Sequence, residues 1–349
     1  MSGLSNADNL RFMSKNRNAK STQPAHAGCS DAPKVSVIIP AYNIAPYIVE
    51  TLNSVFAQTY TDYEIIVVND GSKDSEELET ALAPFFDKII YAKQANAGAS
   101  VARNSAISLS RGTILAFLDG DDIWLPNFLE SQVKFLEKEN FEMVYADAEI
   151  FGDALFEGKS FMKDSPSSGK VTTESLITGE CNVITSGTIL KKDLLEKFGN
   201  FDVNIPRSQD FDLWFRLAKS GTRIGYQHNI LLKYRVRPDN LSGSNVKRAE
   251  RNIIALEIIK EKYDFDAHET QILERQIALC QAELELEKGK VCLVNGNFSE
   301  AQTHIAEANK FFHKPKLSLI NFMIRLSPRL ALQLFKKARP AEFSFIVKG

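Results

Sequence analysis

Three carboxylates lie within four positions of the chain, Asp119, Asp121 and Asp122, in the stretch ILAFLDGDDIWLP. They follow an apolar run rich in β-branched and aromatic residues, which is typical of a buried strand. Carboxylates this close repel one another, so keeping all of them ionised is costly unless a cation shares the site. Because side chains alternate along an extended chain, Asp119 and Asp121 point the same way. Their oxygens suit Mg²⁺ or Mn²⁺, which bind a few carboxylates together with substrate phosphates.

Helix capping is the competing interpretation of these acids. Asp121 or Asp122 could cap a helix that begins near Leu125, with Pro126 in its first turn. We expect Asp122 to act in this way. Three capping acids would be redundant, so the sequence favours a metal site formed by Asp121 and Asp119.

The sequence lacks the motifs of several other active sites. It contains no GxxxxGK[ST] motif, no GxGxxG after a strand, no HExxH and no GxSxG. The four cysteines are scattered without a CxxC pair, which favours reduced thiols over a zinc site. Carboxylates with a metal, rather than a glycine-rich loop, would therefore hold a nucleotide diphosphate.

The composition is that of an ordinary globular protein. Of the 349 residues, 44% are hydrophobic and 25% are charged, and the net charge is −2. No apolar run approaches the roughly 18 residues of a membrane-spanning helix. Residues 1–20 also lack the apolar core of a signal peptide. We therefore expect a cytoplasmic protein with no nucleic acid among its partners.

Strands and helices alternate from residue 34 onward. Apolar runs predict strands at 34–40, 63–70, 87–94 and 113–119, and helical spacing predicts helices at 45–59, 75–86 and 99–110. Their short connections suit only right-handed βαβ units, which predicts a largely parallel sheet with helices on both faces. Ligands of such sheets bind beyond the carboxyl ends of the strands. Polar segments should therefore line one rim, at Pro40–Asn43, Asn69–Ser72, Lys93–Gly98 and Asp119–Asp122.

Changes in sequence character predict three regions. Residues 1–33 lack periodicity, which predicts a flexible leader with a short helix around Leu10–Met13. Residues 34–240 would form the α/β domain, and residues 246–349 a helical region. Within the α/β domain we also expect strands at 143–150, 184–192 and 223–237, and helices at 193–198 and 208–221.

The helical region contains one segment that resembles a tetratricopeptide-like hairpin, followed by a basic stretch at 313–340. The basic stretch contains seven Lys and Arg residues and no acid, and its apolar residues could form the face of an amphipathic helix pair. Two interpretations remain open for this tail. It could pack on the body of the protein, or it could make peripheral contact with an anionic membrane surface.

Five motifs occur in order and at sensible intervals: VSVIIPAYN (35–43), VVNDGSKD (67–74), NAGASVARN (96–104), FLDGDD (117–122) and SQDFDLWFRL (208–217). Together they resemble the family 2 inverting glycosyltransferases, which have the GT-A fold. The resemblance covers about residues 34–240. It implies an α/β, Rossmann-like domain with a mostly parallel central sheet flanked by helices, here followed by a C-terminal helical appendage.

The resemblance also implies a nucleotide-sugar donor, most often a UDP-sugar, bound across the first four strands. Asp70 would hydrogen-bond the uracil, although an Asx-turn before a helix is the alternative. Arg103 would contact the nucleotide or hold the rim acids by ion pairing. Asp121 would ligate the cation directly, and Asp119 would reach the ribose or a metal-bound water. The remaining nucleotide-binding residues would be Pro40, Ala41, Asn43 and Asn96.

Inversion requires an acceptor hydroxyl to attack opposite the departing UDP, so a base must remove the acceptor proton. Asp210 matches the base position of the family, and a helix cap is the alternative role for this residue. The family commonly has Glu where this chain has Gln209, which would hydrogen-bond the acceptor. Many relatives place a His after the last strand, where this chain offers Arg235 and Arg237. Arg237 would then clamp the diphosphate, or it is a surface residue.

The resemblance predicts a metal-dependent hexosyl or N-acetylhexosaminyl transferase that builds a surface polysaccharide or a lipid-linked glycan. Two other functions compete with this prediction. A haloacid-dehalogenase-like phosphatase would also use an acidic strand end, but that strand should come first in the domain and here it is fourth. An inactive sugar-nucleotide-binding relative would have lost catalytic residues, yet Asp70, Asp121 and Asp210 are all present.

Overall fold

The computed structural model describes residues 32–152, 157–163, 165–167, 169–237 and 245–348, together with the backbone of 11–12. The chain divides into two compact units. The first consists of residues 1–149, 159–173 and 180–235, and the second of residues 150–158, 174–179 and 236–349.

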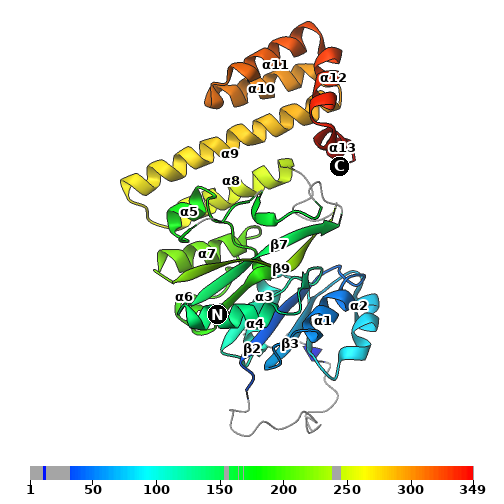
Figure 1. The fold of residues 1–349 in the computed structure, drawn as a ribbon, viewed down its shortest axis with the longest axis vertical. Helices are drawn as coiled ribbons and strands as arrows, with labels where there is room; N and C mark the ends of the chain where they lie inside the picture. The colour runs from blue at the N-terminus through cyan, green and yellow to red at the C-terminus, as the bar shows by residue number, and fades with distance from the viewer. Residues whose placement is uncertain are drawn as a thin grey trace, which may run out of the picture. The chain divides into compact units, whose positions relative to one another are not determined.

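A nine-stranded sheet runs through the first unit in the order β1-β4-β3-β2-β5-β8-β7-β9-β6. Figure 1 labels β2, β3, β7 and β9 of this sheet. The parallel part of the sheet contains β2 (Val35–Ala41), β3 (Tyr63–Asp70), β4 (Ile90–Gln94) and β5 (Ile114–Phe117). Beyond β5 the paired strands are antiparallel, and they include β8 (Thr188–Lys191), β7 (Met143–Gly152), β9 (Ile224–Val236) and β6 (Ile123–Trp124). The predicted parallel sheet is therefore confirmed for the four strands with short βαβ connections.

The strand register brings the carboxyl ends of the parallel strands to one edge. Asn69 at the end of β3 lies opposite Ala41 of β2 and Lys93 of β4, and Asp70 lies opposite Gln94. β5 ends two residues before Asp119 on the other side of β2. The predicted rim of polar segments is thus confirmed by the pairing itself.

Helices cover both faces of this sheet. Those of the first unit are α1 (Ile48–Phe56), α2 (Ser75–Leu82), α3 (Ala99–Leu109), α4 (Phe128–Lys138), α6 (Asp193–Phe198) and α7 (Gln209–Lys219), with the 3₁₀ turns η2 (Ala83–Phe85), η3 (Phe161–Lys163) and η4 (Thr185–Gly187). Side chains alternate along each strand. Val35 and Ile39 therefore join the buried cluster of α1 and α4, while the ring of Phe117 packs against Trp214 of α7.

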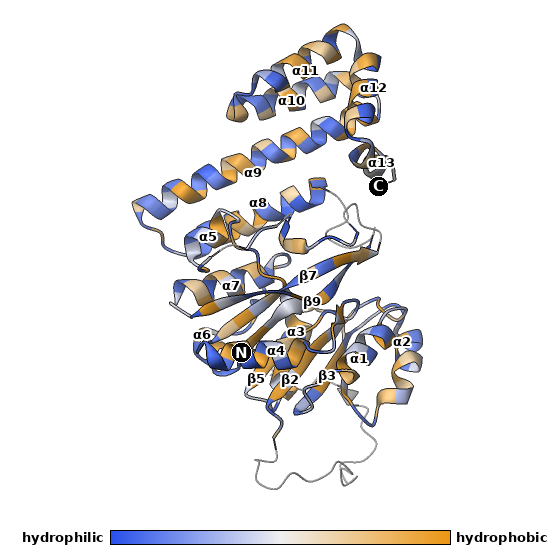
Figure 2. Ribbon diagram, viewed as in Figure 1, coloured by the Kyte–Doolittle hydropathy of each residue, from blue (hydrophilic) through white to orange (hydrophobic). Residues whose placement is uncertain are grey.

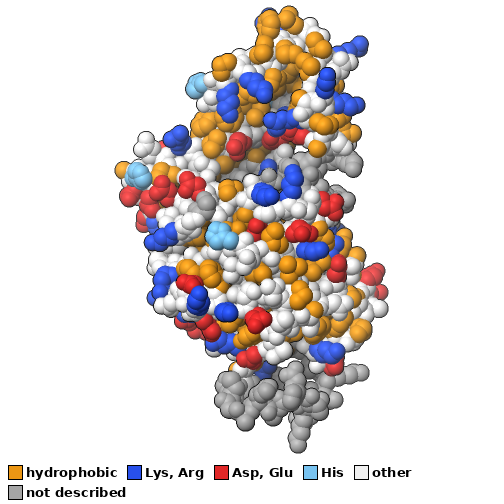
Figure 3. Space-filling model, viewed as in Figure 1, with side chains coloured by type: hydrophobic (Ala, Val, Ile, Leu, Met, Phe, Trp, Pro, Cys, Tyr) orange, Lys and Arg blue, Asp and Glu red, His pale blue; other side chains and the backbone are white. Residues whose placement is uncertain are grey.

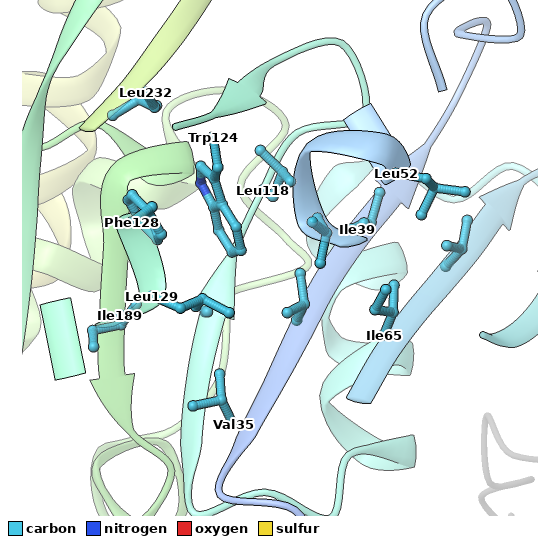
Figure 4. Close-up of a cluster of buried hydrophobic side chains, with 14 of the residues drawn as sticks. Val35, Ile39, Leu52, Ile65, Leu118, Trp124, Phe128, Leu129, Ile189 and Leu232 are labelled. Carbon is cyan, nitrogen blue, oxygen red and sulfur yellow. The ribbon is translucent and has the colours of Figure 1, made fainter. Parts of the chain in front are cut away.

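The apolar core explains why these segments fold as they do. Ile48, Leu52 and Val55 recur at helical spacing in α1, and all three are fully buried. The central strands are mostly hydrophobic, whereas the surface helices carry hydrophilic residues as well (Figure 2). Figure 4 shows the indole of Trp124 beside Phe128, and their rings stack with centroids 4.2 Å apart.

Two expectations about local structure are wrong. Arg11–Phe12 form the short strand β1, antiparallel to β4, where a helix was expected around Leu10–Met13. The rest of 1–31, which holds most of the predicted flexible leader, lies outside the described residues. The second expectation was a single strand at 184–192, but η4 forms at Thr185–Gly187 before β8 begins.

The second unit is largely helical, with α5 (Thr173–Ile177), α8 (Asn245–Lys262), α9 (Ala267–Val294), α10 (Phe298–Phe312), α11 (Pro315–Leu326), α12 (Pro328–Ala338) and α13 (Pro340–Lys348). Asp266 starts α9 through a reciprocal capping box with Glu269. Gly289 allows α10 to approach closely, because a Cβ there would lie 2.8 Å from Ile305. Within the described ranges, no helix combines the length and apolar character needed to cross a bilayer.

Candidate active site

The rim acid Asp119 is paired with a buried arginine from α3. Nη2 of Arg103 lies 2.6 Å from Oδ1 of Asp119, and their side chains are 7% and 35% exposed. The guanidinium also lies over the ring of Phe201, at 5.4 Å from its centroid. Nε and Nη1 of Arg103 have no hydrogen-bond partner among the described residues. The expected ion pair between Arg103 and the rim acids is thus confirmed, and it leaves two guanidinium donors unsatisfied.

Asp122 does not cap a helix, contrary to expectation. The N-cap of α4 is Asn127, and Asp122 is only 1% exposed. Its Oδ1 accepts the backbone N–H of Arg235 at 2.8 Å. Burial raises the pKa of Asp122 well above its ordinary value, and the nearby carboxylates of Asp121 and Asp119 raise it further. This rise in pKa favours the protonated form of Asp122.

Arg235 borders the acidic turn from β9. Its Nε donates to the carbonyl oxygen of Asp121 at 2.8 Å, and its Nη2 pairs with the carboxylate of Glu50. Its guanidinium lies 4.8 Å from the centroid of the Tyr47 ring. Arg237 comes after the end of β9 and belongs to the second unit, so its diphosphate clamp stays a prediction.

Asp70 organises the loop that follows β4. Its Oδ1 accepts the Nε2–H of Gln94 at 2.8 Å and the backbone N–H of Ala97 at 2.9 Å, while its Oδ2 accepts the N–H of Gly98 at 2.8 Å. Asn96 donates to the carbonyl oxygen of Asp70 at 3.0 Å. A carboxylate oxygen has two lone-pair sites, and the second contact of Oδ2, with Nδ2 of Asn96, is long at 3.5 Å. The predicted contact of Asp70 with uracil is compatible with this geometry.

The turn alternative for Asp70 is taken by its neighbour, because Oδ1 of Asn69 accepts the N–H of Ser72 at 2.9 Å. Ser72 in turn links this turn to the first strand, since its hydroxyl accepts the N–H of Asn43 at 3.1 Å and donates to the carbonyl oxygen of Ala41 at 3.2 Å. The first two loops of the rim are therefore held together by hydrogen bonds.

In the first loop, the residues predicted to contact the nucleotide differ in their exposure. Ala41 is fully buried and Pro40 is half-buried. The side-chain oxygen of Asn43 accepts the N–H of Lys73 at 2.9 Å, so this oxygen is already used within the rim. Tyr42, which the sequence reasoning passed over, exposes 43% of its surface in this loop.

Asp210 lies in the first turn of α7, next to Gln209, the half-buried first residue of the helix. Its Oδ1 accepts the N–H of Phe211 at 2.9 Å, and its Oδ2 accepts the hydroxyl of Thr185 at 3.0 Å. The N-cap of α7 is Ser208, so Asp210 is not the capping residue itself, although its contact with Phe211 lies at the helix start.

Two consecutive residues of η4 connect the base candidate to the metal candidate. Thr185 contacts Asp210, and the hydroxyl of Ser186 accepts the backbone N–H of Asp119 at 3.1 Å. Two hydrogen bonds and two neighbouring residues thus join the carboxylate of Asp210 to the backbone nitrogen of Asp119, over on the order of 15 Å at most. Asp119 and Asp210, far apart in sequence, therefore lie at the same small site.

Buried side chains hold the η4 turn in place through hydrogen bonds to its backbone. Nε1 of Trp124 donates to the carbonyl oxygen of Ser186 at 2.7 Å, and Nε2 of Gln132 donates to that of Gly187 at 2.8 Å. Sequence reasoning missed this turn because 184–192 was predicted as one strand. The signal that could have revealed it is the run Thr185–Gly187, whose small polar residues are unsuited to a buried apolar strand.

The acidic rim suits a cation that is shared with a ligand. Among the described residues there is no group of three His, Cys, Asp or Glu side chains that could hold a metal ion. Mg²⁺ or Mn²⁺ needs no such cage when one or two carboxylates and a diphosphate supply the ligands. Asp121 and Asp119 fit this donor set, because the third acid of the cluster, Asp122, is buried.

Comparison with known sequences agrees with the family resemblance of the motifs. The model of the family "Glycosyl transferase family 2" matches residues 36–199. An uncharacterized glycosyltransferase of Rickettsia prowazekii (strain Madrid E) is 34% identical over 222 residues, which cover 63% of this chain and 69% of that protein. The Escherichia coli enzyme UDP-Glc:alpha-D-GlcNAc-diphosphoundecaprenol beta-1,3-glucosyltransferase WfgD is 31% identical over 227 residues, covering 62% of this chain and 83% of WfgD.

Solved structures share the fold. Mannosyltransferase PcManGT from Pyrobaculum calidifontis, in complex with GDP-Man and Mn²⁺, superposes with a TM-score of 0.60 at 19% identity, covering 90% of this chain and 85% of PcManGT. S. aureus TarS 1–349 in complex with UDP gives a TM-score of 0.53 at 18% identity, covering 90% of this chain and 92% of that chain. At these identities the likeness establishes the architecture of the domain alone.

Proposed function

This chain belongs to the family 2 glycosyltransferases, and on that premise we propose that it is an inverting enzyme that moves a sugar from a UDP-sugar to a hydroxyl of a lipid-linked glycan. The observation that carries the proposal is the η4 turn, whose consecutive residues Thr185 and Ser186 contact Asp210 and Asp119. A donor-side acid and an acceptor-side base would thereby meet at one site. Family membership removes the support for the phosphatase alternative.

The proposed donor is a UDP-hexose or UDP-N-acetylhexosamine. WfgD is named for UDP-Glc, and TarS has been solved with UDP-GlcNAc. Oδ2 of Asp70 would accept an N–H of the base in place of its long 3.5 Å contact with Asn96, and Pro40 and Asn43 border the same rim. The mannosyltransferase PcManGT is complexed with GDP-Man, so a GDP-sugar is the donor to test beside UDP-sugars.

The proposed cation is Mn²⁺ or Mg²⁺, held by Asp121 with help from Asp119. When bound there, it would supply positive charge to the diphosphate that leaves with the nucleotide. Arg103 fixes the orientation of Asp119 through the 2.6 Å ion pair. Nε and Nη1 of Arg103, which have no hydrogen-bond partner among the described residues, would be donors for further negative charge.

Asp210 would act as the base. It would take the proton of the acceptor hydroxyl while that oxygen forms a bond to the anomeric carbon. The bond from this carbon to the UDP oxygen breaks on the opposite face, and UDP leaves with the electron pair, so the configuration inverts. Thr185 holds Oδ2 of Asp210 in place, and the amide of Gln209 would orient the acceptor hydroxyl.

The proposed acceptor and location follow from the relative WfgD, whose name specifies a sugar on diphosphoundecaprenol. An acceptor with such a lipid carrier stays in the membrane. The enzyme would therefore work at the inner face of the cell membrane, in the synthesis of a surface polysaccharide. Release of free UDP or GDP, measured across a panel of UDP- and GDP-sugars, would identify the donor.

Replacing the base separates the catalytic proposal from its alternatives. Asp210→Asn should lower turnover by at least about a hundredfold, the lower end of what a general base contributes, while Mn²⁺-dependent UDP binding in calorimetry stays unchanged. Asp193→Asn is the matched control, because Asp193 is an exposed acid in the first turn of α6. If the two variants behave alike, Asp210 is a helix-end residue. If the unsubstituted protein binds no nucleoside diphosphate, the proposed transfer from a nucleotide sugar is wrong.

A further inference from the structure

Helix α11 carries two apolar faces where one would suffice for packing. Its inner face packs on the cluster of Leu293, Ala301 and Ile305, with Ile324 fully buried there. Three other large side chains point outward and are 58%, 55% and 68% exposed: Leu319, Phe322 and Leu326. Their spacing of three and four residues places them on one side of the helix, opposite the packed face.

The next helix, α12, also has exposed apolar side chains. Leu330 and Leu334 stand one turn apart on α12, and they are 48% and 45% exposed. Exposed apolar side chains that occur singly need no explanation, but a contiguous patch rimmed by polar residues marks an interaction surface. We call the set Leu319, Phe322, Leu326, Leu330 and Leu334 the outer face.

Basic residues flank the outer face. At 3.6 residues per turn, Lys316 and Arg325 lie on either side of the α11 stripe, and Arg329 and Lys337 belong to α12. In the part of the chain that the structure describes, no carboxylate forms an ion pair with any of these four cations. The stretch 313–340 contains no acid. Figure 3 shows hydrophobic and basic side chains intermingled over α10–α12, with few acidic ones among them.

We propose that the outer face of α11 and α12 docks the protein on an anionic lipid surface, with the leucines and Phe322 inserted at the level of the headgroups. Interfacial helices combine an apolar stripe with flanking Lys and Arg, and their binding adds apolar burial to attraction by anionic lipids. The unpaired cations supply the charge complementarity that selects this occupant over a neutral one. The surface stands on its own contacts and does not depend on the proposed transfer reaction.

Under this proposal the tail combines the two roles that the sequence left open. Its inner residues are part of the core of the second unit, while its outer residues are available to a partner. Truncation at residue 310 would remove Ile324 and Ala331 from that core, so loss of binding would be ambiguous. Point substitutions on the outer face keep the core intact.

Flotation with vesicles tests the proposal on the full chain. Phosphatidylcholine vesicles containing phosphatidylserine should carry the protein upward, and pure phosphatidylcholine vesicles should carry much less. Lys316→Gln with Arg325→Gln should weaken binding by about fivefold per charge. Leu319→Ser with Phe322→Ser should weaken it by about tenfold or more, because apolar burial is lost.

Matched substitutions on the first unit control for general effects. Lys134→Gln with Lys138→Gln removes two exposed cations from α4, and Val203→Ser removes an exposed apolar side chain. Both controls should float like the unsubstituted protein, and all variants should keep the same thermal unfolding midpoint and the same UDP release with a water-soluble acceptor.

Three results would overturn the docking surface. The first is failure of the unsubstituted protein to float with anionic vesicles at low salt. The second is flotation that is unaffected by both outer-face variants. The third is a dimer in sedimentation that Leu319→Ser with Phe322→Ser dissociates without vesicle binding, which would assign the face to a second copy of the chain.

Discussion

The hydroxyl of Thr185 should control turnover through Asp210 without affecting donor binding. In Thr185→Val the shape of the side chain is kept, but Oδ2 of Asp210 loses the donor that lies 3.0 Å away. Oδ1 keeps its contact with the N–H of Phe211, so the carboxylate is released on one side only. A hydrogen bond to a charged group contributes about 1.5–3 kcal/mol.

If that contribution serves to orient the base, kcat should fall by roughly 10- to 150-fold, since about 1.4 kcal/mol corresponds to a factor of ten. The KM for the donor and the Kd for UDP with Mn²⁺ should change little, because the side chain of Thr185 contacts the proposed base. Steady-state release of UDP and calorimetry measure the two quantities separately. Thr185→Ser restores a hydroxyl and should recover most of the turnover.

Thr188→Val is the matched control for this substitution. Thr188 is also buried, and its hydroxyl donates to the carbonyl oxygen of Ile184 without touching an acid. It should lower the unfolding midpoint slightly and leave kcat unchanged. Equal losses in the two variants would show that Thr185 acts only through packing. Unchanged kcat in Thr185→Val would refute the positioning of Asp210 by η4.

Two further predictions concern the rim. Because the pKa of folded Asp122 lies well above 3.8, the unfolded chain loses this proton first as pH rises, so the carboxyl contributes stability at low pH that is lost toward its folded pKa. Asp122→Asn should reduce this loss of stability with rising pH by about 1.4 kcal/mol per unit of pKa rise. Urea unfolding at pH 4, 6 and 8 measures the free energy of unfolding of both proteins. If the two free energies change in parallel with pH, the prediction is contradicted. Gly71→Ala should weaken UDP binding and cost about 1–2 kcal/mol or more of stability, because Gly71 has φ +62° and a Cβ would lie 2.6 Å from the backbone nitrogen of Asn96. Gly98→Ala is the control for backbone strain alone, because Gly98 has φ +92° and a Cβ there would have nothing within 4 Å. Equal UDP affinity in the two variants would rule out the clash between the Cβ added at Gly71 and Asn96 as the cause.

Much of the fold could be predicted from the sequence because, in its first half, the apolar runs, the turn residues and the connection lengths favour the same elements. The strand predicted at 63–70 is β3 with the same ends, and the helix at 193–198 is α6. A continuous apolar run between turn residues has few alternatives to a buried strand. Short connections then leave only parallel neighbours, and the acids that end these strands must meet at one edge.

The later strands were less predictable because their order depends on long-range pairing. β8 inserts beside β5 in the antiparallel sense, and β9 lies between β7 and β6 in the sheet. No periodicity in the segment 184–237 specifies that arrangement. The role of the η4 hydroxyls could therefore not be predicted from the sequence, because it depends on the sheet placing them between two acids.

The sequence by itself determined the acidic strand end, the parallel half of the sheet and the family motifs, because each of these is written in residues that are close along the chain. Only the tertiary structure decided which acid is buried, with its pKa raised, and which cations and hydroxyls contact the acids. Asp122 meets Arg235 across 113 positions, and Thr185 meets Asp210 across 25. Burial and hydrogen bonding set the charge of a carboxyl, and both are properties of the folded neighbourhood rather than of the local sequence.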